Sequence, residues 1–459
     1  MSIHIELLSV LPRDILKNEI MKHLTPEDQT IFGMTCVEYA KLVTPDVGCM
    51  AQHAAIYGRV ELAEIALERD LNAWDEMCGY AAEHARLNIL EMMYRLEKHM
   101  DEDVMSWAAR SGDLEVVKWL RAHECSWDEN SAAQAAGVGA FEVLKWLREN
   151  GCPWDARTCA YAAEHGYLDI LKWARVNGCE WDERTCAYAA GNGHKEILEW
   201  ARENDCPWNY RTAAAAASGG YLDILKWALK NGCGWYSGVC GTAAEYGHKH
   251  ILEWLVKHGY FLGYSAVVGA VMYGDLKMIK WVMENGGLWS ARACEEAATL
   301  GDLEILEWVL GNDCPQSHLM YLKVIEHGHM HVLKWLLDND VRRYHALDEA
   351  AATYGQLEIL QELHARGLTF LESNACDRAA YNGHTEVLEW LIDSGFEYGW
   401  RTTKSAAMRG HLEALQLLVD RDCPCDVEDC IRAANDHIHY DVCDWLREKF
   451  HVEGSCDEW

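Results

Sequence analysis

Residues 152–178 read CPWDARTCAYAAEHGYLDILKWARVNG, and residues 179–205 follow with the same pattern, CEWDERTCAYAAGNGHKEILEWAREND. The glycine in the middle of this pattern marks a position that we call the anchor. Ten anchors stand 27 residues apart without a slip, at Gly112, Gly139, Gly166, Gly193, Gly220, Gly247, Gly274, Gly301, Gly328 and Gly355. A fixed period of this length indicates a stack of small units, each unable to bury its apolar face alone.

The period continues beyond those ten glycines. The further anchors, spaced with two single-residue insertions, are Gly58, Ala85, Gly383, Gly410 and Ile438. This predicts about fifteen units of 27–28 residues over residues 45–459, preceded by a separate module in residues 1–44. Because a stack grows by addition and offers one long surface, its expected function is binding rather than chemistry.

Each unit is predicted to contain two short helices. Asp155 and Thr158 are both candidate N-caps for the first helix. The small pair Ala162–Ala163 recurs in nearly every unit, and it would let helices of adjacent units pack closely. Gly166 suits the left-handed conformation that ends a helix, and a second helix is expected over about residues 167–177. No alternation of period two appears, so the chain is predicted to be an all-α solenoid of helix-turn-helix repeats.

Composition restricts the classes of partner. Half of the 459 residues are apolar, and the formal net charge is -32. That charge repels polyanions, so nucleic acid and membrane are not expected as partners, whereas a basic protein surface would be attracted. We found neither a signal peptide nor an 18-residue apolar run, which favours an intracellular protein of the cytoplasm or nucleus.

Many of the nineteen cysteines recur with the period. The loop series contains Cys125, Cys152, Cys179, Cys206, Cys233 and Cys314. The helix series contains Cys159, Cys186, Cys240 and Cys294. Equivalent atoms of adjacent helical units lie roughly 8–10 Å apart, whereas a disulfide needs Cα atoms within about 7 Å. Members of one series therefore cannot easily bridge each other, and we interpret them as reduced, buried side chains.

Tryptophan also forms two periodic series. One lies in the second helix, where its apolar neighbours favour packing over a stacking platform for a ligand. The other lies in the connecting loop, where it either covers the edge of the unit or faces a partner. The two series are Trp119, Trp146, Trp173, Trp200, Trp227, Trp254, Trp281, Trp308, Trp335, Trp390 and Trp445, and Trp127, Trp154, Trp181, Trp208, Trp235 and Trp289.

The unit resembles the ankyrin repeat. The matching residues are Ala189, Ala190, Gly193, His194, Glu196, Ile197 and Leu198. The unit is shorter than the usual ankyrin length of about 33 residues, so the connectors are expected to be tight turns. Short units rich in Trp and Cys look like those of large DNA viruses of protists, which implies a host-cell location if the chain is viral. The resemblance implies a monomeric protein-binding scaffold that needs no cofactor.

Two positions in the first helix vary from unit to unit while their neighbours are nearly constant. They lie five and two residues before the anchor, so they share one side of the helix. The variation reflects either freedom from packing or a recognition surface for a protein target. The candidate residues of this surface, which we call the strip, are Tyr80, Trp107, Arg110, Gln134, Tyr161, Glu164, Tyr188, Thr242, Glu245, Glu296, Lys323, Arg378 and Tyr381.

The segment before the repeats resembles an F-box. Its matching pattern begins at Leu11–Pro12, passes through Leu24 and ends in Cys36, Tyr39 and Leu42. The resemblance implies docking on a Skp1-like adaptor through Leu11, Pro12, Ile15, Leu16, Ile20, Leu24 and Tyr39. An extra residue between Leu16 and Ile20, and Tyr39 where the family has Trp, depart from the pattern. The alternative is a helical cap on the first repeat.

Together these patterns predict a substrate-recruiting F-box subunit of a cullin ubiquitin ligase. The alternative is a scaffold that binds or sequesters a host or cellular protein without ubiquitin. No catalytic motif is present, so the chain is not expected to be an enzyme. The Cys and His residues between 423 and 443 fall mostly on repeat positions, and their spacing fits no common zinc site, so no metal is expected.

Overall fold

The computed structural model describes residues 47–339 and 346–452. Within these ranges the chain forms thirty α-helices and one 3₁₀ helix, and it contains no strand apart from the isolated bridge Gly263–Gly287. The predicted all-α repeat class is confirmed. The F-box-like segment, with all seven predicted adaptor-docking residues, lies outside the described residues.

The helices alternate along the chain between a first and a second helix of each pair. The first helices are α5 (Val47–Tyr57), α7 (Trp74–Glu83), α9 (Glu102–Ser111), α11 (Glu129–Gly137), α13 (Ala156–Glu164), α15 (Glu183–Gly191), α17 (Tyr210–Ser218), α19 (Gly238–Glu245), α21 (Gly263–Tyr273), α23 (Ala291–Leu300), α25 (Leu319–Glu326), α27 (Leu347–Thr353), α29 (Ala375–Asn382), α31 (Trp400–Met408) and α33 (Val427–Asn435). The second helices are α6 (Val60–Arg69), α8 (Leu87–Arg95), α10 (Leu114–Ala122), α12 (Phe141–Glu149), α14 (Leu168–Val176), α16 (Lys195–Glu203), α18 (Leu222–Lys230), α20 (Lys249–Lys257), α22 (Leu276–Glu284), α24 (Leu303–Gly311), α26 (Met330–Asp338), α28 (Leu357–Ala365), α30 (Thr385–Asp393), α32 (Leu412–Asp420) and α34 (Tyr440–Phe450). The 3₁₀ helix is η3 (Leu71–Ala73).

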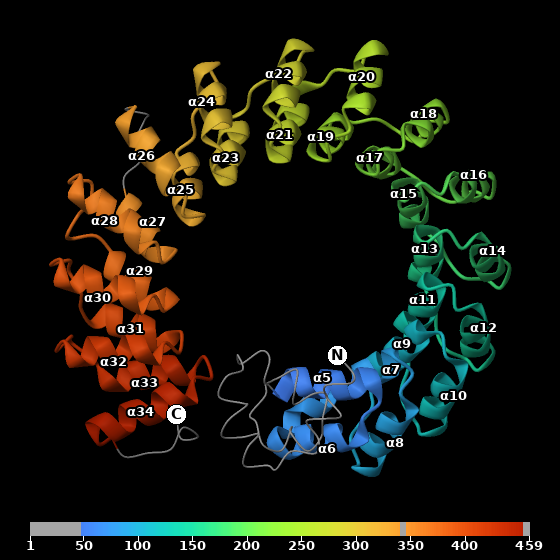
Figure 1. Ribbon diagram of the computed structural model, residues 1–459, viewed down its shortest axis with the longest axis horizontal. Coiled ribbons are helices and arrows are strands. Elements are labelled where there is room, and N and C mark those ends of the chain that lie inside the picture. Colours follow the sequence, from blue (N-terminus) through green and yellow to red (C-terminus); the bar gives the residue numbers. More distant parts are fainter. Residues whose placement is uncertain (1–46, 340–345, 453–459) are drawn as a thin grey trace, which may run out of the picture. The chain divides into compact units, whose positions relative to one another are not determined.

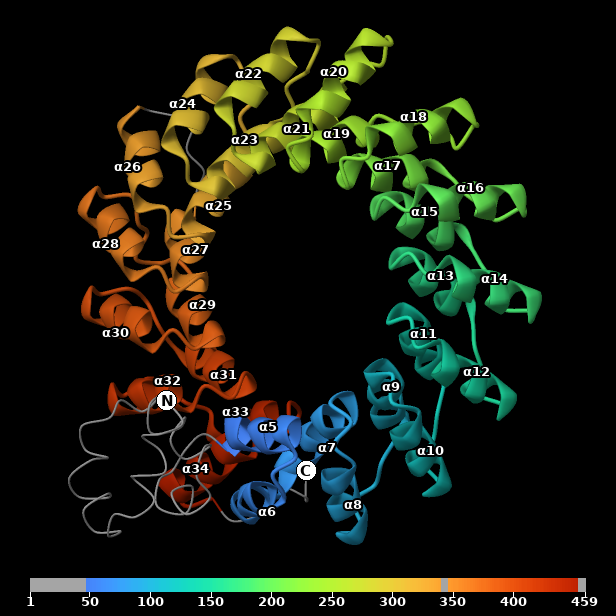
Figure 2. The same cartoon turned by 45° about the vertical axis from the view of Figure 1, so that its right-hand side comes forward.

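The described residues divide into two compact units between Val239 and Cys240, so the boundary falls within the sequence of α19. Within each unit, the first helices follow one another along one side and the second helices along the other (Figures 1 and 2). In the first unit, α11 packs between α9 and α13. Fully buried pairs such as Ala162–Ala163 and Ala189–Ala190 permit this close approach. The second helices bury larger side chains, such as Ile170 and Leu171.

The first helices α9, α11, α13, α15, α17 and α33 begin at a side-chain cap. The Asp155 carboxylate accepts a hydrogen bond from the backbone nitrogen of Arg157 at 2.8 Å, and Asp182 and Asn209 act in the same way in the next two pairs. Such a cap satisfies one of the amide groups that a helix start leaves without a partner. Thr158, the other candidate, lies inside the helix with its hydroxyl buried and without a hydrogen-bond partner. Asp155 is therefore the cap.

Every described anchor adopts the left-handed conformation expected of it. Gly166, for example, has φ +85°. The two anchors that are not glycine do the same, with φ +54° at Ala85 and +66° at Ile438. The repeat geometry therefore imposes this conformation even where the side chain opposes it.

Glycine substitution at these two anchors should stabilise the chain. A residue other than glycine in the left-handed conformation costs about 1–2 kcal/mol, and substitution by glycine removes this cost. Glycine loses more conformational entropy on folding, which offsets part of the stabilisation. We expect Ala85→Gly and Ile438→Gly each to raise the free energy of unfolding by about 0.5–1 kcal/mol. Urea unfolding provides the measurement, with Gly166→Ala as the opposite control. A loss of stability in both glycine variants would contradict the prediction.

The residue after the anchor connects consecutive pairs. The Nε2 atom of His194 lies 3.0 Å from the backbone oxygen of Glu164 at the end of the preceding first helix. His384 and His411 make the equivalent contacts with the oxygens of Thr353 and Tyr381, at 3.0 and 3.1 Å. These contacts satisfy carbonyl groups that a helix end leaves without a partner. The recurrent Gly-His dipeptide is therefore a link between units.

Protonation of His411 should destabilise the folded chain, because the ring that makes this link is partly buried. Burial lowers the pKa of His411, and the positive charge of Arg409 and the neighbouring His384 and His439 lower it further, against the hydrogen bond to Tyr381. The unfolded chain therefore binds more protons once the pH falls below about 6.5, and stability declines there. Gln356 makes the equivalent contact in another pair, so His411→Gln keeps a donor without the titration. We expect the loss of stability between pH 7 and 5 to be smaller in His411→Gln. Urea unfolding at each pH measures it, and equal losses would contradict the argument.

Both cysteine series are buried, as predicted, and the cysteines among the described residues form no disulfide. The loop series has a further role. The Cys179 thiol lies 3.3 Å from the backbone oxygen of Asp155, and Cys206 lies 3.5 Å from that of Asp182. Five of the six loop thiols, those of Cys125, Cys152, Cys179, Cys206 and Cys314, therefore contact the residue that precedes the preceding first helix.

The two tryptophan series pack against each other. The rings of Trp181 in a loop and Trp200 in the following second helix have centroids 5.7 Å apart, and the Arg175 guanidinium lies 4.1 Å from the Trp181 ring. The same pairing recurs at Trp127–Trp146, Trp154–Trp173, Trp208–Trp227 and Trp289–Trp308. Both series are thus partly buried links between consecutive pairs. Among the described helices, none is long and apolar enough to cross a membrane.

Candidate functional site

All thirteen candidate residues of the strip lie on first helices, at positions that are at least partly exposed. The faces on either side of the strip are occupied by buried alanines and cysteines. Nine of the thirteen line one of three grooves between consecutive first helices. The other four, which line none of these three grooves, are Thr242, Glu245, Glu296 and Lys323.

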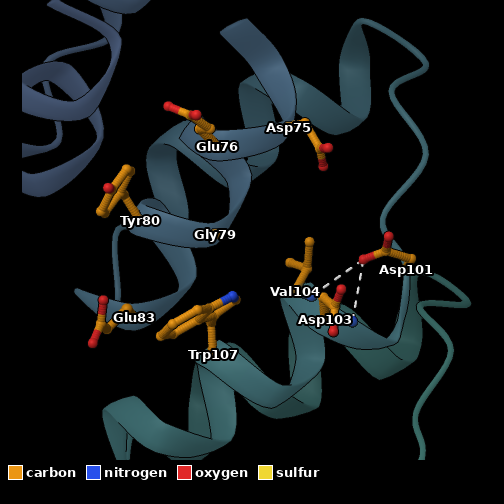
Figure 3. A pocket seen from close by; sticks show the side chains of 9 residues that line it. All are labelled: Asp75, Glu76, Gly79, Tyr80, Glu83, Asp101, Asp103, Val104 and Trp107. Carbon is orange, nitrogen blue, oxygen red and sulfur yellow. Dashed lines mark hydrogen bonds between the residues drawn. The ribbon is translucent and has the colours of Figure 1, made fainter. Parts of the chain in front are cut away.

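The first groove, which we call the acidic groove, lies between α7 and α9 and has a volume of about 320 Å³. Tyr80 and Trp107 provide its aromatic surface, and Figure 3 shows the Trp107 ring beside Gly79 and Glu83. Trp107 is 41% exposed, because Gly79 has no side chain to cover the ring. The full lining consists of Asp75, Glu76, Gly79, Tyr80, Glu83, Asp101, Asp103, Val104 and Trp107.

Five carboxylates make this groove strongly negative. Asp101 is committed to capping α9, where it accepts hydrogen bonds from the nitrogens of Asp103 and Val104. Burial raises the pKa of Asp103, and repulsion from Asp101, Glu102, Asp128 and Asp75 raises it further. Such repulsion is relieved when a cation enters. The groove is therefore electrostatically suited to a positively charged group.

One edge of the acidic groove shows how a cation fits there. The Arg110 guanidinium lies 5.9 Å from the centroid of the Trp107 ring, and its Nε atom lies 3.4 Å from a carboxylate oxygen of Glu83. This arrangement combines a cation–π contact with an ion pair. A Lys or Arg side chain from a partner would find the same two elements, an indole ring and carboxylates, in the rest of the groove.

The second groove, which we call the tyrosine groove, has a volume of about 340 Å³. It includes five strip candidates, namely Arg110, Gln134, Tyr161, Glu164 and Tyr188. Gly137, Val138 and His165 complete its lining. Gly137 stands two residues before its anchor, at the second strip position, and faces the Tyr161 ring. In this unit that position is buried rather than exposed. This groove therefore mixes aromatic, amide and charged groups.

The third groove, which we call the basic groove, lies in the second compact unit and has a volume of about 360 Å³. It contains the strip candidates Arg378 and Tyr381, with Tyr381 38% exposed. Its other lining residues are Asn374, Asp377, Arg401, Lys404, Ser405 and Met408. Lys404 is paired with Asp429 at 2.8 Å, so part of its charge is balanced. The strip therefore carries grooves of opposite polarity.

Sequence reasoning missed a third variable position on the same side of the first helix. It lies nine residues before the anchor and holds Glu76 and Asp103 in the acidic groove, and Asn374 and Arg401 in the basic groove. Four residues separate it from the first strip position, so the helical spacing i, i+4, i+7 could have revealed it. The remaining acidic residues, Asp75 and Asp101, belong to helix starts, and Asp101 stands at the periodic cap position that holds Asp155 and Asp182 in later pairs.

The histidines between residues 327 and 331 are used in structural contacts. The Nε2 atoms of His329 and His331 lie 2.9 Å from the backbone oxygens of Thr299 and Gly301, respectively. Among residues 47–339 and 346–452, no group of three or more His, Cys, Asp or Glu side chains is placed to hold a metal ion.

A family model of ankyrin repeats, described as present in many copies, matches residues 347–392 and 376–419. The C-terminal part of the chain therefore contains ankyrin repeats, a family that indicates no catalytic activity. No curated protein matches the chain.

Similar solved structures are helical repeat proteins. The pentatricopeptide repeat protein PPR10 from maize is 13% identical, with a TM-score of 0.30, over 99% of this chain and 88% of that chain. The same protein in complex with an 18-nt psaJ RNA element is 12% identical, with a TM-score of 0.25, over 99% of this chain and 90% of that chain. At these TM-scores the likeness carries no argument about function.

Proposed function

We propose that this chain is a protein-binding scaffold that holds its target along the strip. The observation that carries the proposal is the placement of nine strip residues in grooves between consecutive first helices. The ankyrin repeats in residues 347–419 support it, because repeat arrays bind partners along extended surfaces. The net charge of -32 disfavours a polyanionic partner such as nucleic acid.

The scaffold proposal is tested by site-specific photocrosslinking in cells. A photoreactive amino acid at Tyr188 on α15 samples the strip, and one at Glu196 on α16 is the control because it is exposed on a second helix of the same pair. We expect a discrete crosslinked protein from position 188 and none from position 196. Equal crosslinking at both positions, or crosslinking only at 196, would show that the strip is not the binding surface.

We further propose that residues 1–44 couple the scaffold to a cullin ubiquitin ligase through a Skp1-like adaptor. The support is the F-box-like sequence pattern from Leu11–Pro12 to Tyr39. In this arrangement the chain raises the local concentration of the target near a ubiquitin-charged enzyme, and the chemistry belongs to that enzyme. The alternative is a scaffold that sequesters its target, with residues 1–44 acting only as a cap.

Affinity capture separates these two functions. The wild type should recover a Skp1-like adaptor and a cullin, and combined substitution of Leu11, Pro12 and Leu24 by alanine should lose both while retaining the target. A Tyr161→Ala, Tyr188→Ala variant is the matched control, expected to lose the target and to keep the adaptor. Recovery of the target without any adaptor from the wild type would support sequestration instead.

A further inference from the structure

The cysteine series come into contact with each other, although members of one series do not. The neighbouring Cys179 thiol raises the pKa of Cys159, Cys186 raises that of Cys206, and Cys314 raises that of Cys294, and burial raises each of them further. In each case one partner lies in a first helix and the other lies in the loop before the next first helix. All six thiols are buried.

A fourth pair near the C-terminus differs in its exposure. The Sγ atoms of Cys425 and Cys430 lie 3.8 Å apart. Cys425 precedes Asp426, the N-cap of α33, and Cys430 lies one turn into that helix. Cys430 is buried, but Cys425 is only partly so, and it occupies the loop position that holds Trp181 in an earlier unit. The loss of the indole at this position leaves a thiol within reach of solvent.

The surroundings give the two thiols different acidities. The hydrogen bond from Cys430 lowers the pKa of Cys425, and the Thr403 hydroxyl lowers it further, while burial and the charge of Asp426 oppose them. The hydrogen bond to Cys425 and burial raise the pKa of Cys430. A thiolate is the nucleophilic form of cysteine, so Cys425 is the better attacking group. Cys430 keeps its proton and lies beside it.

We propose that Cys425 and Cys430 form a redox-sensitive pair that closes into a disulfide when a peroxide oxidises the chain. The Cys425 thiolate attacks one oxygen of hydrogen peroxide, which breaks the O–O bond, forms a sulfenic acid and releases hydroxide. The Cys430 sulfur then attacks the Cys425 sulfur, and the sulfenic hydroxyl leaves with the Cys430 proton as water. The peroxide receives the two electrons that the two sulfurs lose.

The Cys425–Cys430 disulfide can form with only a small movement of the chain, because the two sulfurs are already 3.8 Å apart. A disulfide bond measures about 2.05 Å, so the sulfurs must approach by a little less than about 2 Å, which the loop position of Cys425 favours. The site adjoins α31, because the Thr403 hydroxyl lies 3.0 Å from the backbone oxygen of Pro424, and Cys423 lies 3.4 Å from that of Gly399. The disulfide would therefore form at the junction between α31 and α33.

The test uses the full chain, reduced and then titrated with hydrogen peroxide. Thiols that remain are alkylated, disulfides are reduced and labelled with a second reagent, and peptides are mapped by mass spectrometry. We expect Cys425 and Cys430 to convert together, at least about tenfold faster than the buried pair Cys186–Cys206. Cys186 and Cys206 are the internal control, since these two thiols are also neighbours but both are buried, whereas Cys425 is partly exposed.

Two variants assign the roles. In Cys430→Ser, we expect dimedone to trap a sulfenic acid at Cys425, and in Cys425→Ser we expect Cys430 to stay reduced. The proposal is overturned if the wild type forms no 425–430 disulfide, if Cys425 bridges two chains instead, or if Cys186–Cys206 oxidises as fast. The wild-type mapping decides the matter even if a serine variant fails to fold.

Discussion

Alanine at Gly269 should destabilise the second compact unit by about 3 kcal/mol or more, although alanine is the better helix former. Gly269 lies in the middle of α21 and is buried against α19. A Cβ atom there would overlap the backbone oxygen of Gly241 and lie 2.9 Å from the backbone nitrogen of Glu245. Both obstacles are backbone atoms, so no side-chain rotation relieves them, and the two helices must move apart.

Gly311→Ala provides the matched control. Gly311 is the last residue of α24, and a Cβ atom there would meet nothing within 4 Å. We expect this variant to gain about 0.5–1 kcal/mol, which is the helix preference of alanine without the overlap. Urea unfolding followed by tryptophan fluorescence measures both variants, and hydrogen exchange should localise the loss in Gly269→Ala to α19 and α21. A similar gain in the free energy of unfolding in both variants would show that the close approach of α19 and α21 leaves room for a Cβ atom at position 269.

The prediction extends to the first compact unit. A Cβ atom at Gly219 would overlap the backbone oxygen of Gly191, which is the last residue of α15. Gly219→Ala is therefore expected to separate α15 and α17 as Gly269→Ala separates α19 and α21. Paired glycines at these two places let consecutive first helices approach backbone to backbone.

The period in the sequence was sufficient to predict the fold, because each helix end demands a particular kind of residue. The anchors at Ala85 and Ile438 illustrate this, since spacing alone placed them where the structure has positive φ. The cap at Asp155 followed from its chemistry, but the competing candidate Thr158 could be rejected only once its burial was known. The spacing of residues in the sequence therefore predicts where a helix ends better than it predicts which polar side chain caps the helix start.

The site could be predicted only in part. Variation along the first helix identified Tyr80 and Trp107, but Gly269, which occupies an equivalent slot, is a buried contact rather than an exposed one. Whether a slot opens into a groove depends on the distance between consecutive first helices, which the period does not encode. The Cys425–Cys430 contact was missed as well, because Cys425 stands at a loop tryptophan position and the spacing does not give its distance from Cys430 in the following helix.

Reversing two charges of the acidic groove should abolish its affinity for a cationic side chain. The variant is Glu76→Lys with Asp103→Lys, which places two ammonium groups beside Tyr80 and Trp107. The probe is a neutral peptide that carries one central Arg, Lys or norleucine. We expect the wild type to bind the Arg and Lys peptides at least about tenfold more tightly than the norleucine peptide, and the variant to lose this preference.

The control for net charge is Glu64→Lys with Glu68→Lys, because both residues are exposed on the second helix α6 and the change in charge is the same. If the groove selects the cation, this control keeps the preference, and the wild-type affinity for the Arg peptide falls as salt is raised. If the total charge of -32 alone attracts the peptide, both double variants weaken binding equally.

Trp107→Leu distinguishes the contribution of the ring from that of the carboxylates. This variant retains every charge of the groove, so a loss of preference for the cationic peptides assigns the selection to the indole face. Binding of the norleucine peptide as tight as that of the Arg peptide would rule out a cation site between α7 and α9.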